Sequence, residues 1–337
     1  MKHFLTIAAI FIYCQINART LTLNNNNPSA GQYRTWAAAL AAANNGDTIL
    51  IHGSVNNYYT LNVEKRLVII GPGHNPIDKQ NAQKAFGDAI TFYAGSAGSK
   101  VYGMEVSYMQ VLNDNIDSVE IHLCRMNDGF YANGYNCHYW LFDGNVFASS
   151  GQNIHGQNRA MGDFTYRNNI FNGTINNCNG TYIGYTYFNN NIFLGNTTYS
   201  FQYCNYFYLN NNIFYRAGFA DYGDVGFTYT KNCSYQSQGG ITFPNGVNYE
   251  NVDPQFVTNI GTGDYFSYNT NYHLQPTSPL VGGGSDGNDV GIYGGYGDYE
   301  QNGVPHNPYI KTFNITGPTT VNAGDSLHIY IKAKVRN

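Results

Sequence analysis

The sequence Asn145-Val146-Phe147 returns, with small changes, four more times along the chain. The later copies are Asn169-Ile170-Phe171, Asn191-Ile192-Phe193, Asn212-Ile213-Phe214 and Asn232-Cys233-Ser234. Successive copies begin 24, 22, 21 and 20 residues apart. A repeat of this length is typical of a solenoid, in which each copy forms one coil of a continuous stack.

Bulky residues recur at two fixed positions before each asparagine. Three residues before it stand Phe142, Tyr166, Phe188, Leu209 and Tyr229, and five residues before it stand Trp140, Phe164, Thr186, Phe207 and Phe227. Positions two apart lie on the same face of a strand, so we expect both columns to point inward. Coils in such a sheet lie about 4.8 Å apart, so these side chains stack on their own equivalents.

The repeated asparagine falls at the turn after this strand. A buried carboxamide there can bond the turn backbone and the asparagines of the neighbouring coils. Such bonds satisfy groups that would otherwise cost about 1 to 3 kcal/mol each. We therefore interpret the column as an asparagine ladder; the alternative is that the five amides line a sugar-binding groove.

Composition excludes one class of partner. Of the 337 residues, 42% are hydrophobic and 16% aromatic but only 11% are charged, and the formal net charge is -4. Nucleic-acid binding needs clustered Lys and Arg, and the chain has no basic run. We expect no nucleic-acid partner.

The first 18 residues have the layout of a secretory signal peptide. Lys2 and His3 precede an apolar run, which is followed by small or polar residues up to Ala18. Cys14 raises the alternative of a lipoprotein, although Tyr13 before it is bulky for such a site. No later apolar run approaches the ~20 residues that a transmembrane helix needs. We expect a secreted product, extracellular or on the cell surface, without a transmembrane segment.

The cysteines of the mature chain predict neither a disulfide framework nor a zinc site. They are odd in number and lack CxxC spacing, namely Cys124, Cys137, Cys178, Cys204 and Cys233. We expect most of them to be small core residues.

Two segments outside the repeat resemble a known family. An alanine-rich segment at 35–46, expected to be a short helix, is followed by strand-like runs in GDTILI (46–51), YYTLNV (58–63) and RLVIIGPG (66–73). Beyond the repeat come DPQF (253–256), YHLQPTSPL (272–280), GGG (282–284) and DVGIYGG (289–295). Together they resemble the opening and closing coils of bacterial secreted right-handed parallel β-helix proteins of the pectate-lyase-like superfamily.

The resemblance implies an all-β fold, a right-handed parallel β-helix (solenoid) at 19–304 with an N-terminal capping helix. Residues 305–337 change character: 309–315 and 326–335 alternate with period two around a Gly/Pro/Asn-rich region. This pattern predicts two antiparallel strands, a short C-terminal β extension.

Enzymes of this superfamily suggest where chemistry could occur. Those that cleave acidic polysaccharides combine calcium-binding acidic residues with an Arg or Lys base, and the hydrolases use clustered Asp. No such motif matches here residue by residue.

The best catalytic candidates are Asp143, Asp163, Arg167, His138 and Arg159, which the column alignment brings toward one patch. They suit a polysaccharide lyase better than a glycoside hydrolase; the alternative is a surface ion pair between Asp143 and Arg167 beside unrelated groups.

Four tyrosines form a candidate binding surface. The outward columns bring Tyr185, Tyr187, Tyr206 and Tyr208 together on two neighbouring coils. Flat rings with hydroxyl groups suit stacking on sugar faces. The alternative is that a loop or the C-terminal extension covers them.

Calcium is the one cofactor that the sequence suggests. GGGSDGND at 282–289 is similar to a single calcium-binding glycine-rich repeat, but such sites need stacked neighbours, and a structural turn is the competing interpretation.

Two functions remain open. One is a monomeric, exported protein that binds a polysaccharide or cell-surface glycan, with or without lyase activity. The other is a non-catalytic surface, adhesion or structural module.

Overall fold

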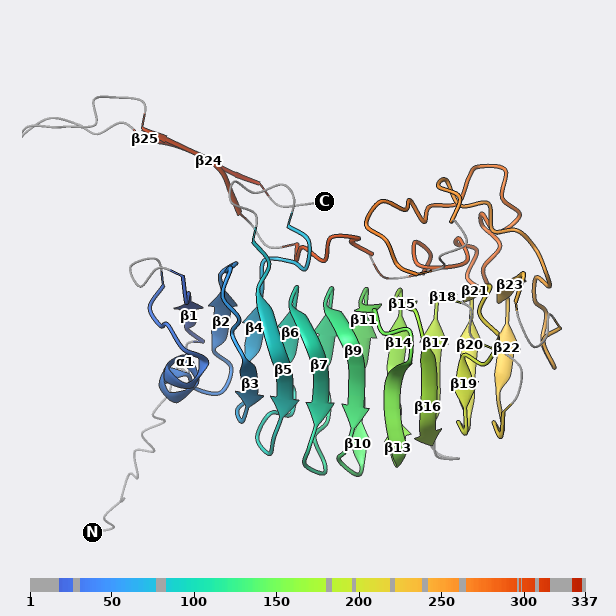
Figure 1. Cartoon of the computed structure of the whole chain (residues 1–337), viewed down its shortest axis with the longest axis horizontal. Coiled ribbons are helices and arrows are strands. Elements are labelled where there is room, and N and C mark those ends of the chain that lie inside the picture. The colour runs from blue at the N-terminus through green and yellow to red at the C-terminus, as the bar shows by residue number, and fades with distance from the viewer. Residues whose placement is uncertain are drawn as a thin grey trace, which may run out of the picture.

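The computed structural model describes residues 18–26, 31–76, 83–179, 184–195, 198–218, 222–237, 242–260, 265–295, 297, 299–306, 309–315 and 329–334. The chain forms a parallel β-solenoid of about 8 turns (Figure 1). This confirms the all-β solenoid that the repeat predicts. Residues 1–17 of the expected signal peptide lie outside the described part.

Ten strands from successive stretches of the chain make the first sheet. Their order follows the chain, and every pair is parallel. They are β1 (Thr20–Leu23), β2 (Thr48–Ile51), β4 (Val68–Ile70), β6 (Lys100–Tyr102), β8 (Glu120–His122), β11 (Leu141–Asp143), β14 (Thr165–Arg167), β17 (Thr186–Asn189), β20 (Phe207–Asn210) and β22 (Thr228–Thr230).

The second sheet has thirteen strands because its long strands give way to pairs of short ones. The long strand β9 pairs with β12 near its start and with β13 near its end. The members are β3 (Thr60–Val63), β5 (Phe86–Phe92), β7 (Glu105–Val111), β9 (Arg125–Ala132), β10 (Cys137–His138), β12 (Val146–Phe147), β13 (Gln152–Gly162), β15 (Ile170–Phe171), β16 (Thr174–Asn179), β18 (Ile192–Leu194), β19 (Phe201–Gln202), β21 (Ile213–Tyr215) and β23 (Cys233–Tyr235).

The short helix α1 (Trp36–Ala42) lies beside the first coil (Figure 1). It begins where the hydroxyl of Thr35 accepts a hydrogen bond from the Ala38 amide at 3.3 Å. Trp36 is buried, and its indole donates to the carbonyl of Asn62 in β3 at 2.8 Å. The ammonium of Lys65 bonds the carbonyls of Leu40 and Ala43, satisfying acceptors that the end of a helix leaves open.

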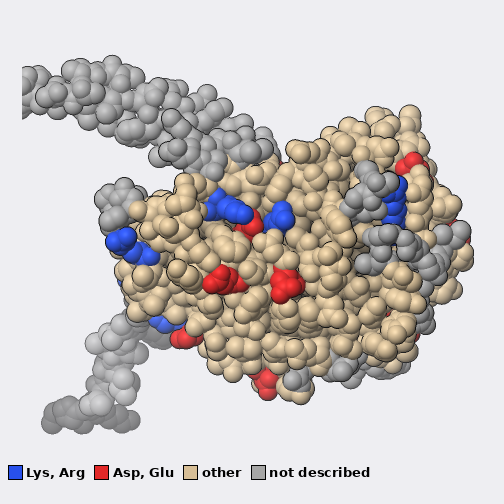
Figure 2. Space-filling view, in the orientation of Figure 1, with Lys and Arg blue, Asp and Glu red and all other residues tan. Residues whose placement is uncertain are grey.

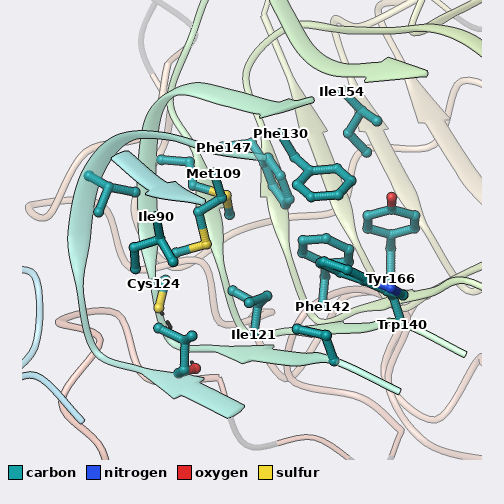
Figure 3. Packing of buried hydrophobic residues seen from close by; sticks show 14 of the residues in the cluster. Ile90, Met109, Ile121, Cys124, Phe130, Trp140, Phe142, Phe147, Ile154 and Tyr166 are labelled. Carbon is teal, nitrogen blue, oxygen red and sulfur yellow. Dashed lines mark hydrogen bonds between the residues drawn. The ribbon is translucent and has the colours of Figure 1, made fainter. Parts of the chain in front are cut away.

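The interior is a continuous apolar core filled by the predicted columns (Figure 3). Phe142 stacks on Tyr166 and Tyr166 on Phe188, both with ring centroids 4.7 Å apart. The phenylalanine of each motif makes a second stack, in which Phe193 and Phe214 lie 4.6 Å apart and 5° from parallel. All five cysteines of the described chain are free and buried, as expected of small core residues.

The asparagine column is a hydrogen-bonded ladder. The carboxamide of Asn169 donates to the Oδ1 atom of Asn191 at 3.0 Å and to the carbonyl of Phe142 at 2.9 Å. The same pattern joins Asn145 to Asn169, Asn191 to Asn212, and Asn212 to Asn232. The residue before each ladder asparagine has a positive φ, namely Gly144, Asn168, Asn190, Asn211 and Lys231. Glycine and asparagine tolerate this conformation best.

The chain beyond the repeat returns along the coils, as the orange and red trace of Figure 1 shows. We call the described residues from Ser285 to Pro305 the strap. Its amides and carbonyls bond the positive-φ column: Ser285 N donates to Asn211 Oδ1 at 2.8 Å. Further along, Asn168 Nδ2 donates to the carbonyls of Ile292 and Gly294, both at 2.8 Å.

A second apolar cluster lies between the coils and this returning chain. It contains the residue that follows each of the last four ladder asparagines, together with covering side chains from the returning chain. The coil residues are Ile170, Ile192, Ile213 and Cys233, and the covering residues include Leu280, Val290 and Ile292. The motif thus places Asn in the turn, its aliphatic residue outward under the strap and its phenylalanine inward.

The C-terminal strands β24 (Tyr309–Ile315) and β25 (Ile329–Lys334) pair antiparallel with each other. Figure 1 shows this two-stranded sheet standing away from the coils. No helix in the described ranges is long and apolar enough to cross a membrane.

Candidate functional site

The four predicted tyrosines do form one cluster, on the outward face of the ten-stranded sheet. Tyr187 stacks on Tyr208, its register partner, with centroids 5.5 Å apart and planes 11° apart. Tyr185 lies 4.5 Å from Tyr208 and 6.3 Å from Tyr206. Each side chain keeps partial exposure. We call Tyr185, Tyr187, Tyr206 and Tyr208 the tyrosine patch; it presents ring faces and hydroxyls to a ligand.

Next to the patch, the structure has a polar pocket of about 250 Å³. The sheet supplies Arg167, Asn189 and Asn210, and the strap supplies Ser285 and Asp286. Asn210 donates from Nδ2 to Asn189 Oδ1 at 3.1 Å, which fixes the orientation of both carboxamides. Sequence reasoning did not find this pocket, because the strap residues are far away in the chain and occur once.

Asp143 and Arg167 are register partners on adjacent strands, as the column alignment predicts. Arg167 donates from an Nη atom to Asp143 Oδ2 at 2.8 Å. The side chain of Asp143 is only 13% exposed, because Gly297 of the strap lies over it. The ion pair is therefore partly covered rather than a simple surface contact.

These two residues end a charged row along the outward face of the same sheet. His122 Nδ1 lies 3.6 Å from Asp143 Oδ2, and His122 donates from Nε2 to Glu120 Oε2 at 3.0 Å. Lys100 in turn lies 2.8 Å from the other oxygen of Glu120. Glu120 thus lies between Lys100 and His122, and Asp143 lies between His122 and Arg167.

The row also explains the acidity of Asp143. Burial raises the pKa of this carboxyl, but hydrogen bonds from His122 and Arg167 and the Arg167 charge outweigh burial and hold the pKa below its usual value. Burial likewise raises the pKa of Glu120, and the hydrogen bonds from Lys100 and His122 bring it below the usual range. Both carboxylates are ionised near neutral pH and serve as acceptors.

The other predicted catalytic residues lie elsewhere. His138 belongs to β10 of the thirteen-stranded sheet, and its Nδ1 atom lies 4.0 Å from Asp163 Oδ2. In the described part of the chain, no hydrogen bond or ion pair joins these two residues to Asp143 or Arg167. Arg159 lies in β13, but its side chain is outside the described residues.

This geometry favours binding over proton abstraction. Arginine is always charged in proteins, and Arg167 donates to an ionised carboxylate. A lyase base has to give up its proton before it can take one from the sugar. Arg167 is better suited to donating hydrogen bonds to a ligand in the pocket beside it.

The GGGSDGND segment, with its similarity to a single calcium-binding repeat, forms a turn held by its own side chains. Asp286 Oδ1 accepts from the Asn288 amide at 3.1 Å, and Asp289 Oδ1 accepts from the Gly282 amide at 2.9 Å. Within the described ranges, no group of three or more His, Cys, Asp and Glu residues is arranged to hold a metal ion.

Charge is sparse on the solvent surface, and Figure 2 shows one face on which uncharged atoms predominate. Comparison with known proteins adds no relative: no family model matches the chain, and no curated protein matches it. The fold and the site together define a parallel β-solenoid with an aromatic, polar surface beside its strap.

Proposed function

We propose that this protein is an exported glycan-binding protein, and that a polysaccharide lies along the outward face of the ten-stranded sheet. The observation that carries the proposal is that Tyr187 and Tyr208 stack in register, and that two residues further along the same strands Asn189 and Asn210 line the polar pocket. Export is accounted for by the expected signal peptide at 1–18.

The chemistry of a sugar chain matches this surface. Sugar rings have apolar faces that stack on tyrosine, while their hydroxyls need donors and acceptors at the rim. Asn189 and Asn210 offer both, Arg167 donates and Asp286 accepts. The rigid sheet holds these groups at the coil spacing of about 4.8 Å, which suits a ligand that is itself a repeating chain.

The proposal includes a likeness to the pectate-lyase-like superfamily, in which the coil would be right-handed and α1 would cap its first turn; the parallel solenoid supports this likeness. The proposal does not extend to the cleavage chemistry of that superfamily, because Asp143 already holds Arg167. We propose binding without cleavage.

The test is retention of the purified protein on native gels that contain polysaccharides, in a panel of acidic and neutral glycans. We expect retention on at least one glycan, and loss of retention in the double variant Tyr187→Ala/Tyr208→Ala. Tyr59→Ala is the matched control, because Tyr59 is 69% exposed and lies outside the patch. Mobility unchanged on every glycan would overturn the proposal and favour a non-catalytic adhesion or structural module.

A second measurement separates binding from lyase activity. The absorbance of unsaturated products is followed during incubation with each acidic polysaccharide, with and without calcium. We expect no increase. An increase that disappears in Arg167→Ala would instead make the chain a polysaccharide lyase.

A further inference from the structure

A second pocket, of about 310 Å³, shares no lining residue with the pocket beside the tyrosine patch. It lies where β21 and β23 end, against residues 253–260 and Gln275. Its volume is at the lower end of the ~300–1,000 Å³ range of small-molecule sites. The pocket is therefore matched to one small ring rather than to a length of polymer.

One wall of this second pocket is aromatic and fixed. Tyr215 and Tyr235 are register partners on adjacent strands, with centroids 5.4 Å apart and planes at 45°. The Phe256 ring also contacts Tyr215, with centroids 5.7 Å apart and planes at 46°. Tyr215 is buried, and its hydroxyl donates to the carbonyl of Ile260 at 3.4 Å. Tyr215 therefore supports the wall from behind, and the partly exposed ring of Tyr235 is the aromatic face that the pocket presents.

The rest of the lining is polar and electrically balanced. Arg216 donates from Nε to Gln236 Oε1 at 3.0 Å and its guanidinium lies 5.5 Å from the Tyr215 ring. Asp253 accepts at Oδ1 from the amide of Gln255 at 2.9 Å. Arg216 and Asp253 are the one cation and the one carboxylate among the lining residues. The lining therefore carries no net charge. The pocket gives no advantage to a charged ligand.

We infer that this pocket binds a single uncharged sugar unit, such as the end or a side branch of a glycan. The inference rests on the proposed glycan-binding function and adds a second site to it. A pyranose ring stacks on the exposed face of Tyr235, and its hydroxyls bond the carboxamides of Gln236 and Asn259 and the carboxylate of Asp253. The sheet face would then hold the chain of the glycan, and the pocket its terminus or branch.

The state of Tyr235 agrees with this assignment. Burial, and then the nearby Asp253 carboxylate, raises the pKa of Tyr235 above its usual value. Its hydroxyl donates to the Asp253 carboxylate, and its oxygen can accept a hydrogen bond from a sugar hydroxyl.

The test uses the methyl glycosides of glucose, galactose, mannose and N-acetylglucosamine, with methyl glucuronide as the charged comparison. Binding is measured by ligand-observed NMR and titration calorimetry on the full chain. We expect at least one neutral glycoside to bind with a Kd below about 10 mM, and more tightly than the glucuronide. Asn259→Trp, which fills the pocket from an exposed position, should abolish binding, and Asp253→Ala should weaken it at least tenfold. Val55→Trp is the matched control, because Val55 is 79% exposed elsewhere.

Each outcome decides the question. If no neutral glycoside binds the wild-type chain, if the glucuronide binds as tightly, or if binding persists in both pocket variants, the inference is wrong. Thermal melts show whether Asn259→Trp folds; if it does not, Asp253→Ala carries the test. The proposed function fails separately: it is tested by retention on polysaccharide gels in Tyr187→Ala/Tyr208→Ala, whose residues do not line this pocket, whereas the pocket is tested by the binding of single glycosides.

Discussion

Asn169 binds Asn191 twice: its backbone amide and its carboxamide both donate to the Oδ1 atom of Asn191, at 2.9 and 3.0 Å. One oxygen therefore satisfies two buried donors of the neighbouring coil. Because both residues are fully buried, water cannot replace a lost bond. The ladder makes each coil depend on the next for its hydrogen bonds.

Replacing a central rung should therefore destabilise the whole solenoid. In Asn191→Ala, both donors of Asn169 lose their acceptor, and buried unsatisfied groups cost about 1 to 3 kcal/mol each. We expect the free energy of unfolding to fall by about 2 to 5 kcal/mol, measured by urea denaturation. Asn62→Ala is the control, since the Asn62 side chain is half-buried and makes no hydrogen bond with other described side chains. Equal losses in the two variants would contradict the ladder.

The position of the strap should depend on Gly297, because a side chain at this residue would collide with the coils. The backbone of Gly297 does not have a positive φ, so the reason for glycine here is space. A Cβ atom on Gly297 would lie 2.2 Å from Asn168 Oδ1 and 2.9 Å from Asp143 Oδ1. Gly297→Ala should push the strap away and loosen its bonds to Asn168. We expect faster hydrogen exchange and protease cleavage within the strap, with the ten-stranded sheet still protected. Gly151→Ala, whose Cβ would meet only Ser149 Oγ at 3.6 Å, should change neither.

The sequence predicts the parts of this fold that repeat. Phe142 and Tyr166 occupy one column, so a single alignment shows that both face inward, and the same alignment identifies the ladder. It also groups Tyr187 with Tyr208. Each of these follows from a period, because coils of a solenoid stack equivalent residues.

The parts that occur once could not be predicted in the same way. Ile192 and Ile213 look like core residues, yet they point outward and are buried by Leu280 and Ile292 of the returning chain. Nothing local in the motif says which later segment covers it. The pocket beside the tyrosine patch was missed for the same reason, since Asp286 closes it from the strap.

The buried cysteines should be chemically silent in the folded chain. Burial raises the pKa of Cys124 to about 12 from its ordinary 9.0, so its thiolate fraction falls roughly a thousandfold. We expect almost no reaction with a thiol reagent at pH 8 in native protein, and rapid reaction of all five described cysteines in concentrated guanidinium chloride. Fast labelling of the native chain, located by mass spectrometry at Cys124, would contradict the burial of this core position.

Acid should weaken the charged row. The pKa of Asp143 is lower in the folded chain than its ordinary 3.8, so its interactions with Arg167 and His122 contribute fully above about pH 5 and are lost as the pH falls through 3.8 toward the folded value. The stability difference between wild type and Asp143→Asn should be constant from about pH 5 to 7 and shrink below pH 4. Asp163→Asn, at a carboxylate that lies 4.0 Å from the His138 ring, should show a smaller dependence. A difference that grows on acidification would have the wrong sign.

Binding to the tyrosine patch should depend on the ring faces more than on the hydroxyls. Tyr208→Ala removes the stacking partner of Tyr187 and should weaken glycan binding by about tenfold, equivalent to about 1.4 kcal/mol. Tyr208→Phe keeps the ring and should cost less than about threefold. Asn210→Ala removes a rim donor and should fall between the two. The measurement is titration calorimetry with the glycan that retains the wild-type chain. If Tyr208→Phe were as harmful as Tyr208→Ala, the hydroxyl rather than the ring would make the contact, and the glycan would be bound at its edge instead of on its face.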